Sequence, residues 1–473
     1  RTLDIVGPQW YGRTVVRSCH AMSYAQAQAI LDDHSNGGKN SGSGGGGGGE
    51  FADHELLRQE LDVLLRLSQR LRAQRVARGG LELASEEVAF NLDTTTALPT
   101  AVRPHDELPA NDLVAELMLL ANESVARRLR AAFPACALLR AHAHPAPARF
   151  DQLQRVARAA GFDLDTTSNR ALAASLAAVT RADPVAAAVL KTLATRAMAE
   201  AEYICAGTHP VAEHYHYGLG STAYTHFTSP IRRYADIVVH RQLLAAVAQG
   251  EAESQTLPAP APASLAQGTV DAMADHMNRR NHAARRAQKD AMLLFQVCYF
   301  GHHACTCDAV VYTVQADRLL VHVPQYALKT TVFLRDARGA SVLRVPGTDA
   351  VLPADQIRVD CDRQTVALGA PLNVRLRLFD RLVVRLVGTL RRTRRPDLRA
   401  TIVAFGPAAA VSSSSSSSSS ATTATTPTGP VSRAALVGAV FAERTEAIRE
   451  EQHAAVDVTV TTADVQKQQE NHG

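Results

Sequence analysis

The sequence predicts an α+β protein, mainly helical over residues 1–300 and ending in a small β-barrel over residues 305–407. Apolar residues recur at helical spacing through residues 111–205 and 264–296. From residue 309 onwards they fall instead in short β-branched runs separated by turns. An apolar content of 46% in 473 residues suits a folded chain of about three domains.

The first predicted elements are a strand, a helix and a low-complexity insertion. The strand is expected over the aromatic and β-branched residues 10–17. Ser23 is placed to cap a helix over residues 24–31. Residues 36–49 are rich in Gly and Ser and include six consecutive glycines, so they predict a flexible surface insertion.

Further helices and one pair of strands are expected between this insertion and residue 205. A helix over residues 53–77 should turn its leucines (57, 61, 64 and 71) inward and stop at Gly79-Gly80. Alternating apolar residues predict strands within 81–92, and Asn111 or Asp112 is placed to cap the next helix. Three more helices are predicted over residues 150–160, 169–179 and 184–204.

Residues 228–241 combine helix-start signals with two arginines. Ser229 is a good N-cap, and Pro230 suits the first helical position. Arg232 and Arg233 would then lie in the first turn, where free N–H groups and guanidinium groups favour a phosphate. A capped core helix with solvated arginines is an equally good interpretation of these residue types.

The rest of the chain predicts a linker, a basic helix and the barrel. A Pro/Ala linker at 258–262 precedes a long helix over 264–296, whose basic side chains are more often simply a solvated face. The barrel, of the OB type, is expected from strands at 309–314, 319–323, 330–334, 373–379, 381–390 and 398–405. Its residues 372–400 hold nine Arg against two Asp, which suits a single-stranded RNA platform or packing against acidic neighbours.

Several features bear on compartment and metal content. Residues 408–473 contain a serine run and predict a disordered tail with at most one weak helix near 434–452. Seven scattered cysteines fit a reduced, intracellular setting, and no apolar run predicts a membrane span. The group His302, His303, Cys305 and Cys307 lacks a second ligand pair, so a zinc site is the minority interpretation.

Several motifs together resemble the RNase II/RNase R (RNB) superfamily of 3′→5′ exoribonucleases. They are HYGL at 216–219, YTHFTSPIRRYAD at 224–236, WYGRT at 10–14 and ELMLLAN at 116–122. The similarity covers about residues 8–405, and its details resemble most the eukaryotic branch that includes the RNA-exosome catalytic subunit and its cytoplasmic paralogue.

The resemblance implies an RNB-type catalytic portion over 1–300, acting on single-stranded RNA in the cytoplasm or the nucleus, with the exosome core as partner. It implies that Arg232 clamps the scissile phosphate, aided by the neighbouring Thr228, Ser229 and Arg233. It also implies nucleotide contacts from two rings near the base and a carboxylate near the ribose. These three residues are Tyr24, Phe90 and Glu116.

The sequence departs from the family in its metal ligands. The family uses Mg²⁺ held by closely spaced aspartates, and no such cluster occurs here; Asp32-Asp33 is a poor substitute. We therefore expect a chain truncated at its N-terminus, downstream of those ligands, which alone binds RNA weakly and hydrolyses little of it. A non-catalytic RNA-binding protein of the same fold and an organellar RNase R-type exoribonuclease are the alternatives.

Overall fold

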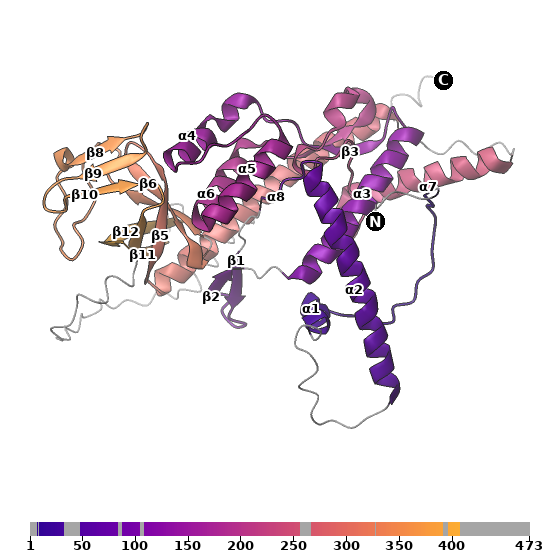
Figure 1. Cartoon of the computed structure of the whole chain (residues 1–473), viewed down its shortest axis with the longest axis horizontal. Coiled ribbons are helices and arrows are strands. Elements are labelled where there is room, and N and C mark those ends of the chain that lie inside the picture. The colour runs from indigo at the N-terminus through magenta and orange to yellow at the C-terminus, as the bar shows by residue number, and fades with distance from the viewer. Residues whose placement is uncertain are drawn as a thin grey trace, which may run out of the picture.

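The computed structural model has helices gathered around two short β-ladders and a curled sheet at one end (Figure 1). It describes residues 7, 9–32, 48–83, 88–104, 108–255, 266–326, 328–390 and 396–406. Three predicted regions lie outside these residues: 36–47 of the insertion, the linker 258–262, and the tail 408–473 with its weak helix. Within the described ranges, no helix is long and apolar enough to cross a membrane.

The N-terminal helices are α1 (Tyr24–Asp32), α2 (Gly48–Ala77) and α3 (Pro109–Ala132). Ser23 caps α1 as predicted: its Oγ accepts from the Gln26 N–H at 3.3 Å, and the Gln26 side chain accepts from the Ser23 N–H at 2.8 Å. The predicted stop of α2 is also confirmed. Gly79 takes φ +103° there, and the Gly80 N–H donates to the Arg75 carbonyl at 2.8 Å.

Several predicted elements of this region are wrong. Residues 10–17 form no strand; they run irregularly with Trp10 73% exposed, and no neighbouring strand satisfies their backbone. Leu64 is exposed on α2 rather than inward. Helix α3 begins at Pro109, so Asn111 lies inside it, where its Oδ1 accepts from the Leu108 N–H at 3.3 Å.

A β-hairpin and a two-stranded ladder follow the N-terminal helices. The hairpin pairs β1 (Val88–Leu92) with β2 (Pro99–Pro104), so only part of the predicted strand region 81–92 is a strand. The ladder pairs β3 (Leu138–Ala141) with β4 (Glu202–Cys205) in antiparallel register. Residues 198–204 are therefore not helical as predicted, because they leave the preceding helix to enter β4.

Three helices fill the space between the ladder and the sheet at the end of the chain. They are α4 (Asp151–Ala159), α5 (Asn169–Ala182) and α6 (Pro184–Ala197), close to the predicted ranges. Ser168 caps α5 and Asp183 caps α6 through their side-chain oxygens. Their buried apolar side chains share one core with Tyr312 and Leu378 of the following domain, which fixes that domain against them.

Two long helices complete the first part. Helix α7 (Tyr234–Gln255) packs with α3, β3 and β4 around a second core. Helix α8 (Gln267–His302) begins in this core and ends against the terminal sheet, so it runs between the two halves of the molecule (Figure 1). Short 3₁₀ helices occur at Pro147–Phe150, Ala206–Thr208, Val211–His214, Tyr217–Leu219, Pro324–Tyr326 and Ala354–Gln356.

The terminal domain is a curled five-stranded sheet in the order β12-β11-β5-β6-β7. Its outer strands approach each other, with Thr330 Oγ1 of β7 lying 3.5 Å from the Leu398 carbonyl of β12, which agrees with the predicted OB-type barrel. The strands are β5 (Cys305–Val314), β6 (Arg318–Val323), β7 (Leu328–Phe333), β11 (Arg381–Thr389) and β12 (Asp397–Phe405). A separate sheet, missed in part by the prediction, holds β8 (Ile357–Asp360), β9 (Thr365–Leu368) and β10 (Val374–Arg377).

Candidate functional site

The site loop, residues 226–233, carries the predicted site residues Thr228 to Arg233 and is held between α3 and α7. The Phe227 N–H donates to Asn122 Oδ1 of α3 at 2.9 Å, and the Phe227 carbonyl lies 2.8 Å from His240 Nε2 of α7. The rings of Phe227 and His240 are also in contact, tilted by 33° with centroids 4.6 Å apart. Both backbone groups of one loop residue are thus satisfied by side chains from two helices, which holds the loop in one conformation.

Asp236 anchors the end of the loop from inside α7. Its carboxylate, fully buried, accepts from the Ser229 N–H at 2.7 Å and from Arg233 Nε and Nη2, each at 2.8 Å. The predicted capping by Ser229 is wrong, because α7 begins only at Tyr234 and residues 230–232 form a turn before it. The two arginines therefore precede the helix, and Ile231 is fully exposed rather than packed inward.

Arg232 and Arg233 have different environments and therefore different roles. Arg233 is half-buried and committed to Asp236 by two hydrogen bonds. Arg232 is exposed and has no ion pair to any carboxylate in the described part of the chain. Its charge is among the causes that lower the pKa of the half-buried His226. Arg232 is therefore the guanidinium of this turn that is free to bind an anion.

Strand β3 adds a third arginine, Arg140, which the sequence analysis did not select as a site residue. Arg140 is the direct cross-strand partner of Tyr203 on β4, and its guanidinium carbon lies 4.7 Å from the centre of that ring. The other edge of β3 runs beside the site loop, where the Arg140 N–H donates to the Tyr224 carbonyl at 2.8 Å. A charged residue inside the apolar run 137–141 was the available signal.

The rings around these arginines are buried, except for the half-buried His226, and the imidazoles are neutral. Burial, with the nearby charge of Arg140 and Arg233, lowers the pKa of His226 to about 2, and burial lowers the pKa of His216 to about 3. The hydroxyl of Tyr203 lies 2.7 Å from His226 Nδ1, and Tyr224 accepts from the Asn122 side-chain amide at 3.0 Å. The rings therefore add no charge to the site at neutral pH.

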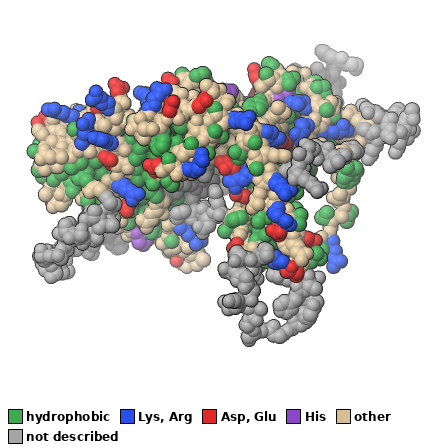
Figure 2. Space-filling view, in the orientation of Figure 1, with side chains coloured by type: hydrophobic (Ala, Val, Ile, Leu, Met, Phe, Trp, Pro, Cys, Tyr) green, Lys and Arg blue, Asp and Glu red, His purple; other side chains and the backbone are tan. Residues whose placement is uncertain are grey.

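The arginine cluster, which we define as Arg140, Arg232 and Arg233 around Tyr203 and His226, is suited to bind an anion. Asp236 is the carboxylate bound to it, and three donors already occupy that group. Cations in surplus over carboxylates, held on a fixed loop, favour a phosphodiester. On the face shown in Figure 2, Lys and Arg are interspersed with Asp and Glu, so surface charge alone does not mark the cluster.

The cluster does not have the donors of a magnesium site. Mg²⁺ prefers carboxylate and water oxygens, whereas this cluster offers guanidinium groups, neutral imidazoles and one occupied carboxylate. Among the described residues, no group of three or more His, Cys, Asp or Glu is arranged to hold a metal ion. His302, His303, Cys305 and Cys307, the residues of the minority zinc interpretation, are described and form no such group.

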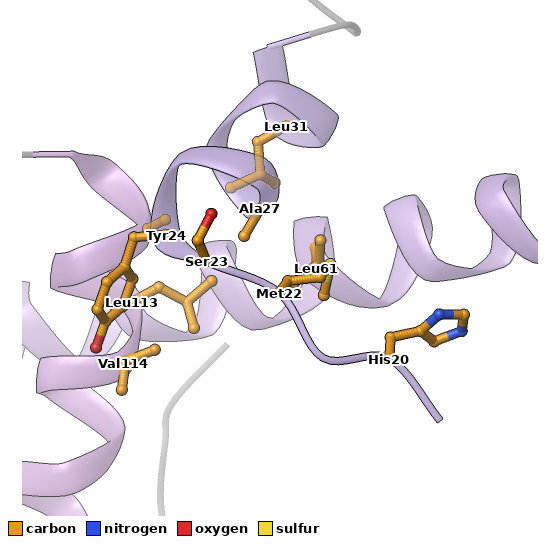
Figure 3. A pocket seen from close by; sticks show the side chains of 10 residues that line it. His20, Met22, Ser23, Tyr24, Ala27, Leu31, Leu61, Leu113 and Val114 are labelled. Carbon is orange, nitrogen blue, oxygen red and sulfur yellow. The ribbon is translucent and has the colours of Figure 1, made fainter. Parts of the chain in front are cut away.

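Tyr24 lies apart from the arginine cluster, at the start of α1. Its side chain is 46% exposed and lines a cavity of about 440 Å³ between α1, α2 and α3. Figure 3 shows the ring beside Leu113 and Val114 of α3, with Met22 and Leu61 on the other side of the cavity. The setting is apolar with one aromatic face available, as a base-binding residue requires.

Glu116 and Phe90 lie in two further settings. Glu116 on α3 is buried and pairs with Arg75 of α2, with Oε1 2.5 Å from Nη2 and 3.1 Å from Nε. Phe90 on β1 packs against Phe295 of α8, with ring centroids 5.5 Å apart, and against the barrel core. In the part of the chain that the structure describes, no hydrogen bond or ring contact joins Tyr24, Glu116 or Phe90 to the arginine cluster.

Exposed arginines lie on the curled sheet and on the separate sheet of β8, β9 and β10, so the basic strand face that was predicted for the barrel is divided between two sheets. All the arginines of 372–400 that the structure describes are exposed, and they lie on the last three strands: Arg375, Arg377, Arg381, Arg385 and Arg399. Arg399 forms an ion pair with the nearby carboxylate of Asp397, at 2.6 Å. The other four have no ion pair within the described ranges, so they remain open to a polyanion.

Comparison with known proteins connects this site to one family. The family model described as "RNB domain" matches residues 3–249, which include the arginine cluster and its loop. A probable exosome complex exonuclease of Caenorhabditis elegans is 35% identical over 361 residues, covering 76% of this chain and 35% of that protein. The chain spans about a third of the length of such curated relatives.

Solved structures share the fold. RNase R of Mycoplasma genitalium, solved with ribose-methylated single-stranded RNA, superposes with a TM-score of 0.58 at 19% identity, over 80% of this chain and 53% of that one. Yeast Ssd1, described as a pseudonuclease, superposes with a TM-score of 0.55 at 16% identity, over 82% of this chain and 53% of that one. At these identities the likeness concerns architecture alone.

Proposed function

Since the chain belongs to the RNB-domain family, we propose that it binds single-stranded RNA and serves its 3′→5′ exonucleolytic hydrolysis. The observation that carries this proposal is the arginine cluster: guanidinium groups in surplus over carboxylates on a rigidly held loop. An RNA backbone supplies the phosphates that such a cluster lacks.

In this proposal, the site loop binds the RNA backbone at the scissile phosphate. Arg232 contacts the phosphate, and Asp236 keeps Arg233 and the turn at Ser229 in place. Thr228 and Ser229 are half-buried beside the two arginines and contribute polar groups to the same backbone. A fixed guanidinium fork orients a phosphodiester better than a mobile one, because less side-chain entropy is lost on binding.

The three outlying residues recognise the terminal nucleotides in this proposal. Tyr24 and Phe90 would stack on bases, and Glu116 would accept a hydrogen bond from a ribose 2′-OH, the group that distinguishes RNA from DNA. The exposed face of Tyr24 supports its assignment. For Glu116, the ribose would have to share the carboxylate with Arg75.

The reaction proposed is hydrolysis of the last phosphodiester bond, which releases a nucleoside 5′-monophosphate. In this family Mg²⁺ supplies the activated water and stabilises the leaving oxygen. The described residues offer no donor set for that ion, so we assign no chemical step to them beyond binding and orienting the phosphate.

The proposal includes a setting for this activity. Curated relatives are named as exosome complex exonucleases. We accordingly propose an intracellular role in RNA decay and processing, in the cytoplasm, the nucleus or both, with the RNA exosome core as partner. Co-purification of tagged full-length protein with a ring of exosome core subunits would test the partner.

The salt dependence of RNA binding tests the proposed site. Substituting Arg232→Ala should weaken binding of a single-stranded RNA about tenfold and reduce the slope of log K against log salt by about 0.7, the value of one phosphate contact. Arg170→Ala, which removes an exposed arginine from α5, serves as the matched control. An Arg232→Ala protein with the affinity and salt slope of the control would remove Arg232 from the site.

A non-catalytic RNA-binding protein of the same fold is the second candidate. It is favoured by the donor set of the cluster, which binds anions but holds no free carboxylate. Release of mononucleotides from 3′-tailed RNA in the presence of Mg²⁺ separates the two candidates. Robust release by the purified chain would exclude the second one, whereas RNA binding without release would favour it.

A further inference from the structure

Arg140 is a buried cation without a counter-charge among the residues that the structure describes. It is 7% exposed, in the middle of a strand whose four residues are all buried. Within the described ranges, no carboxylate forms an ion pair with it. Its contact with the Tyr203 ring at 4.7 Å leaves the other face and edges of the guanidinium without an anionic partner.

Two positive charges close to Arg140 raise the free-energy cost of burying its own charge. Arg233 and Arg285 both lie close enough to repel it, and burial together with these charges lowers the pKa of Arg140. Arg233 is compensated by Asp236 at 2.8 Å, and Arg285 by Glu200 at 3.5 Å. Arg140 therefore differs from its neighbours, because each of them has a carboxylate and it has none in the described structure.

A second arginine–tyrosine pair in the same chain provides a comparison, because its role is purely structural. Arg196 on α6 lies 5.6 Å from the ring centre of Tyr312 on β5, and its guanidinium donates to the Tyr312 hydroxyl at 3.4 Å. Arg196 is exposed, so water solvates its charge and the pair joins α6 to the barrel at little cost. Arg140 is only 7% exposed, so water solvates far less of its charge, and packing against an aromatic ring does not explain why a cation is buried there.

From this juxtaposition we propose that Arg140 is a second phosphate-binding residue, acting from β3 opposite Arg232 on the same RNA backbone. The inference rests on the proposed RNA-binding function and adds a residue to it. The Tyr203 ring packs against the Arg140 guanidinium, with 4.7 Å between the guanidinium carbon and the ring centre. The hydrogen bond between Tyr203 and His226 connects that ring to the site loop. A phosphate bound between β3 and the loop supplies the negative charge that the fold omits.

Thermal unfolding in phosphate tests the proposal without RNA. The full chain is melted in sodium phosphate and in sodium chloride at matched ionic strength and pH. Phosphate should raise the melting temperature of the parent and of the Arg196→Gln control, and Arg140→Gln should lose at least half of that rise. In chloride, Arg140→Gln should be at least as stable as the parent, because it removes a buried uncompensated charge. Equal stabilisation of parent and Arg140→Gln by phosphate would overturn the proposal.

RNA binding supplies the second arm. Arg140→Gln should reduce the slope of log K against log salt by about 0.7 and weaken binding about tenfold, whereas Arg196→Gln should leave both unchanged. Should Arg140→Gln fail to fold, Arg140→Lys keeps the charge and should keep the salt slope while losing affinity through loss of the bidentate fork. An Arg140→Lys protein with full affinity would then count against the proposal.

The two arms separate this inference from the function on which it rests. A loss of salt slope in Arg232→Ala but not in Arg140→Gln would overturn the role of Arg140 alone. Failure of the parent chain to bind RNA at all would overturn the proposed function, and the phosphate melting experiment would still decide whether Arg140 binds a phosphate.

Discussion

At the scale of single residues, Asp236 is the group on which the site geometry depends. Its carboxylate is fully buried and accepts from the Ser229 N–H and from Nε and Nη2 of Arg233. Asp236→Asn would leave Arg233 uncompensated and should lower the free energy of unfolding by about 3 kcal/mol. Urea denaturation of the variant measures this loss, and RNA affinity should fall with it because the turn before α7 is no longer fixed.

A surface pair of the same chemistry provides the control for this prediction. Asp317 and Arg318 also form a bidentate pair, at 2.6 and 2.9 Å, but both side chains are 38% exposed. Asp317→Asn should cost less than about 1 kcal/mol, because water already solvates both charges. Similar losses in the two variants would show that burial does not govern the Asp236 pair.

The buried histidines predict how stability varies with pH. The pKa of His216 is about 3 in the folded chain, below the value of about 6.5 in the unfolded chain. The unfolded state therefore takes up a proton first, so the stability is fully present above about pH 6.5 and is lost as the pH falls towards 3. Between pH 6.5 and pH 5 this one residue should account for about 2 kcal/mol.

Urea unfolding at both pH values measures this effect. His216→Asn should lose less stability on acidification than the parent, and His276→Asn, which replaces an exposed histidine of α8, should behave as the parent does. Identical losses in the parent and His216→Asn would contradict the assignment of His216 as a buried neutral ring.

Residue patterns predicted part of the site. The order of residues 224–236 indicated two arginines at a helix start, and the structure has them in the turn before α7. The prediction that Ser229 caps the helix was wrong. Serine is a common residue at a helix start, but here the backbone N–H of Ser229 donates to the Asp236 carboxylate. Arg140 could not be assigned from the sequence, because its environment is created by Tyr203, 63 positions further along the chain.

At the scale of elements, a buried ion pair joins α2 to α3. Arg75 and Glu116 have side chains 11% and 7% exposed, and Oε1 lies 2.5 Å from Nη2. Arg75→Met should destabilise the chain by about 3 kcal/mol, because it leaves the buried carboxylate of Glu116 unpaired. Glu116→Gln should cost less, because Arg75 keeps Glu82 at 3.5 Å. The double variant Arg75→Met with Glu116→Leu should recover much of that loss.

A double-mutant cycle from urea unfolding gives the coupling energy between the two residues. Additive single losses would show that the pair does not hold the helices together. The same variants report on the proposed ribose contact. If Glu116 serves only the helix pair, the double variant will discriminate RNA from DNA as well as the parent does.

Local patterns predicted elements well where caps and periodicity agree. Helix α1 starts after Ser23, as its predicted capping residue indicates, and α5 starts at the predicted residue 169. Residues 10–17 have strand composition but no partner strand among the described residues. Residues 198–204 continue an apolar pattern past the end of α6, where pairing with β3 outweighs helix propensity. Tertiary context decided both of these outcomes.

At the scale of the whole molecule, one long helix and one shared core connect the loop to the barrel. Helix α8 contributes to the core around β3 and β4 and also to the core of the barrel. Tyr312 of β5 packs in the core of α4 to α6, so the barrel is fixed relative to the site. The strands β11 and β12, which carry exposed arginines, therefore lie at a set position relative to β3 and α7 (Figure 1).

This arrangement predicts that one RNA strand contacts both regions. Charge reversal on the barrel, as in Arg381→Glu with Arg385→Glu, should weaken binding of a long single-stranded RNA more than binding of a four-nucleotide RNA. Fluorescence anisotropy with RNAs of two lengths measures the difference. Equal weakening for both lengths would place the barrel arginines in the same short binding site as Arg232.

The central claim is that the loop 226–233 holds the RNA backbone, and photo-crosslinking tests it most directly. A single-stranded RNA carrying a 4-thiouridine next to its 3′ end is irradiated with the purified chain, and the crosslinked peptides are identified by mass spectrometry. The account predicts crosslinks in the segments 137–142 and 224–236 that surround the arginine cluster. Crosslinks confined to the barrel, residues 305–407, would contradict it.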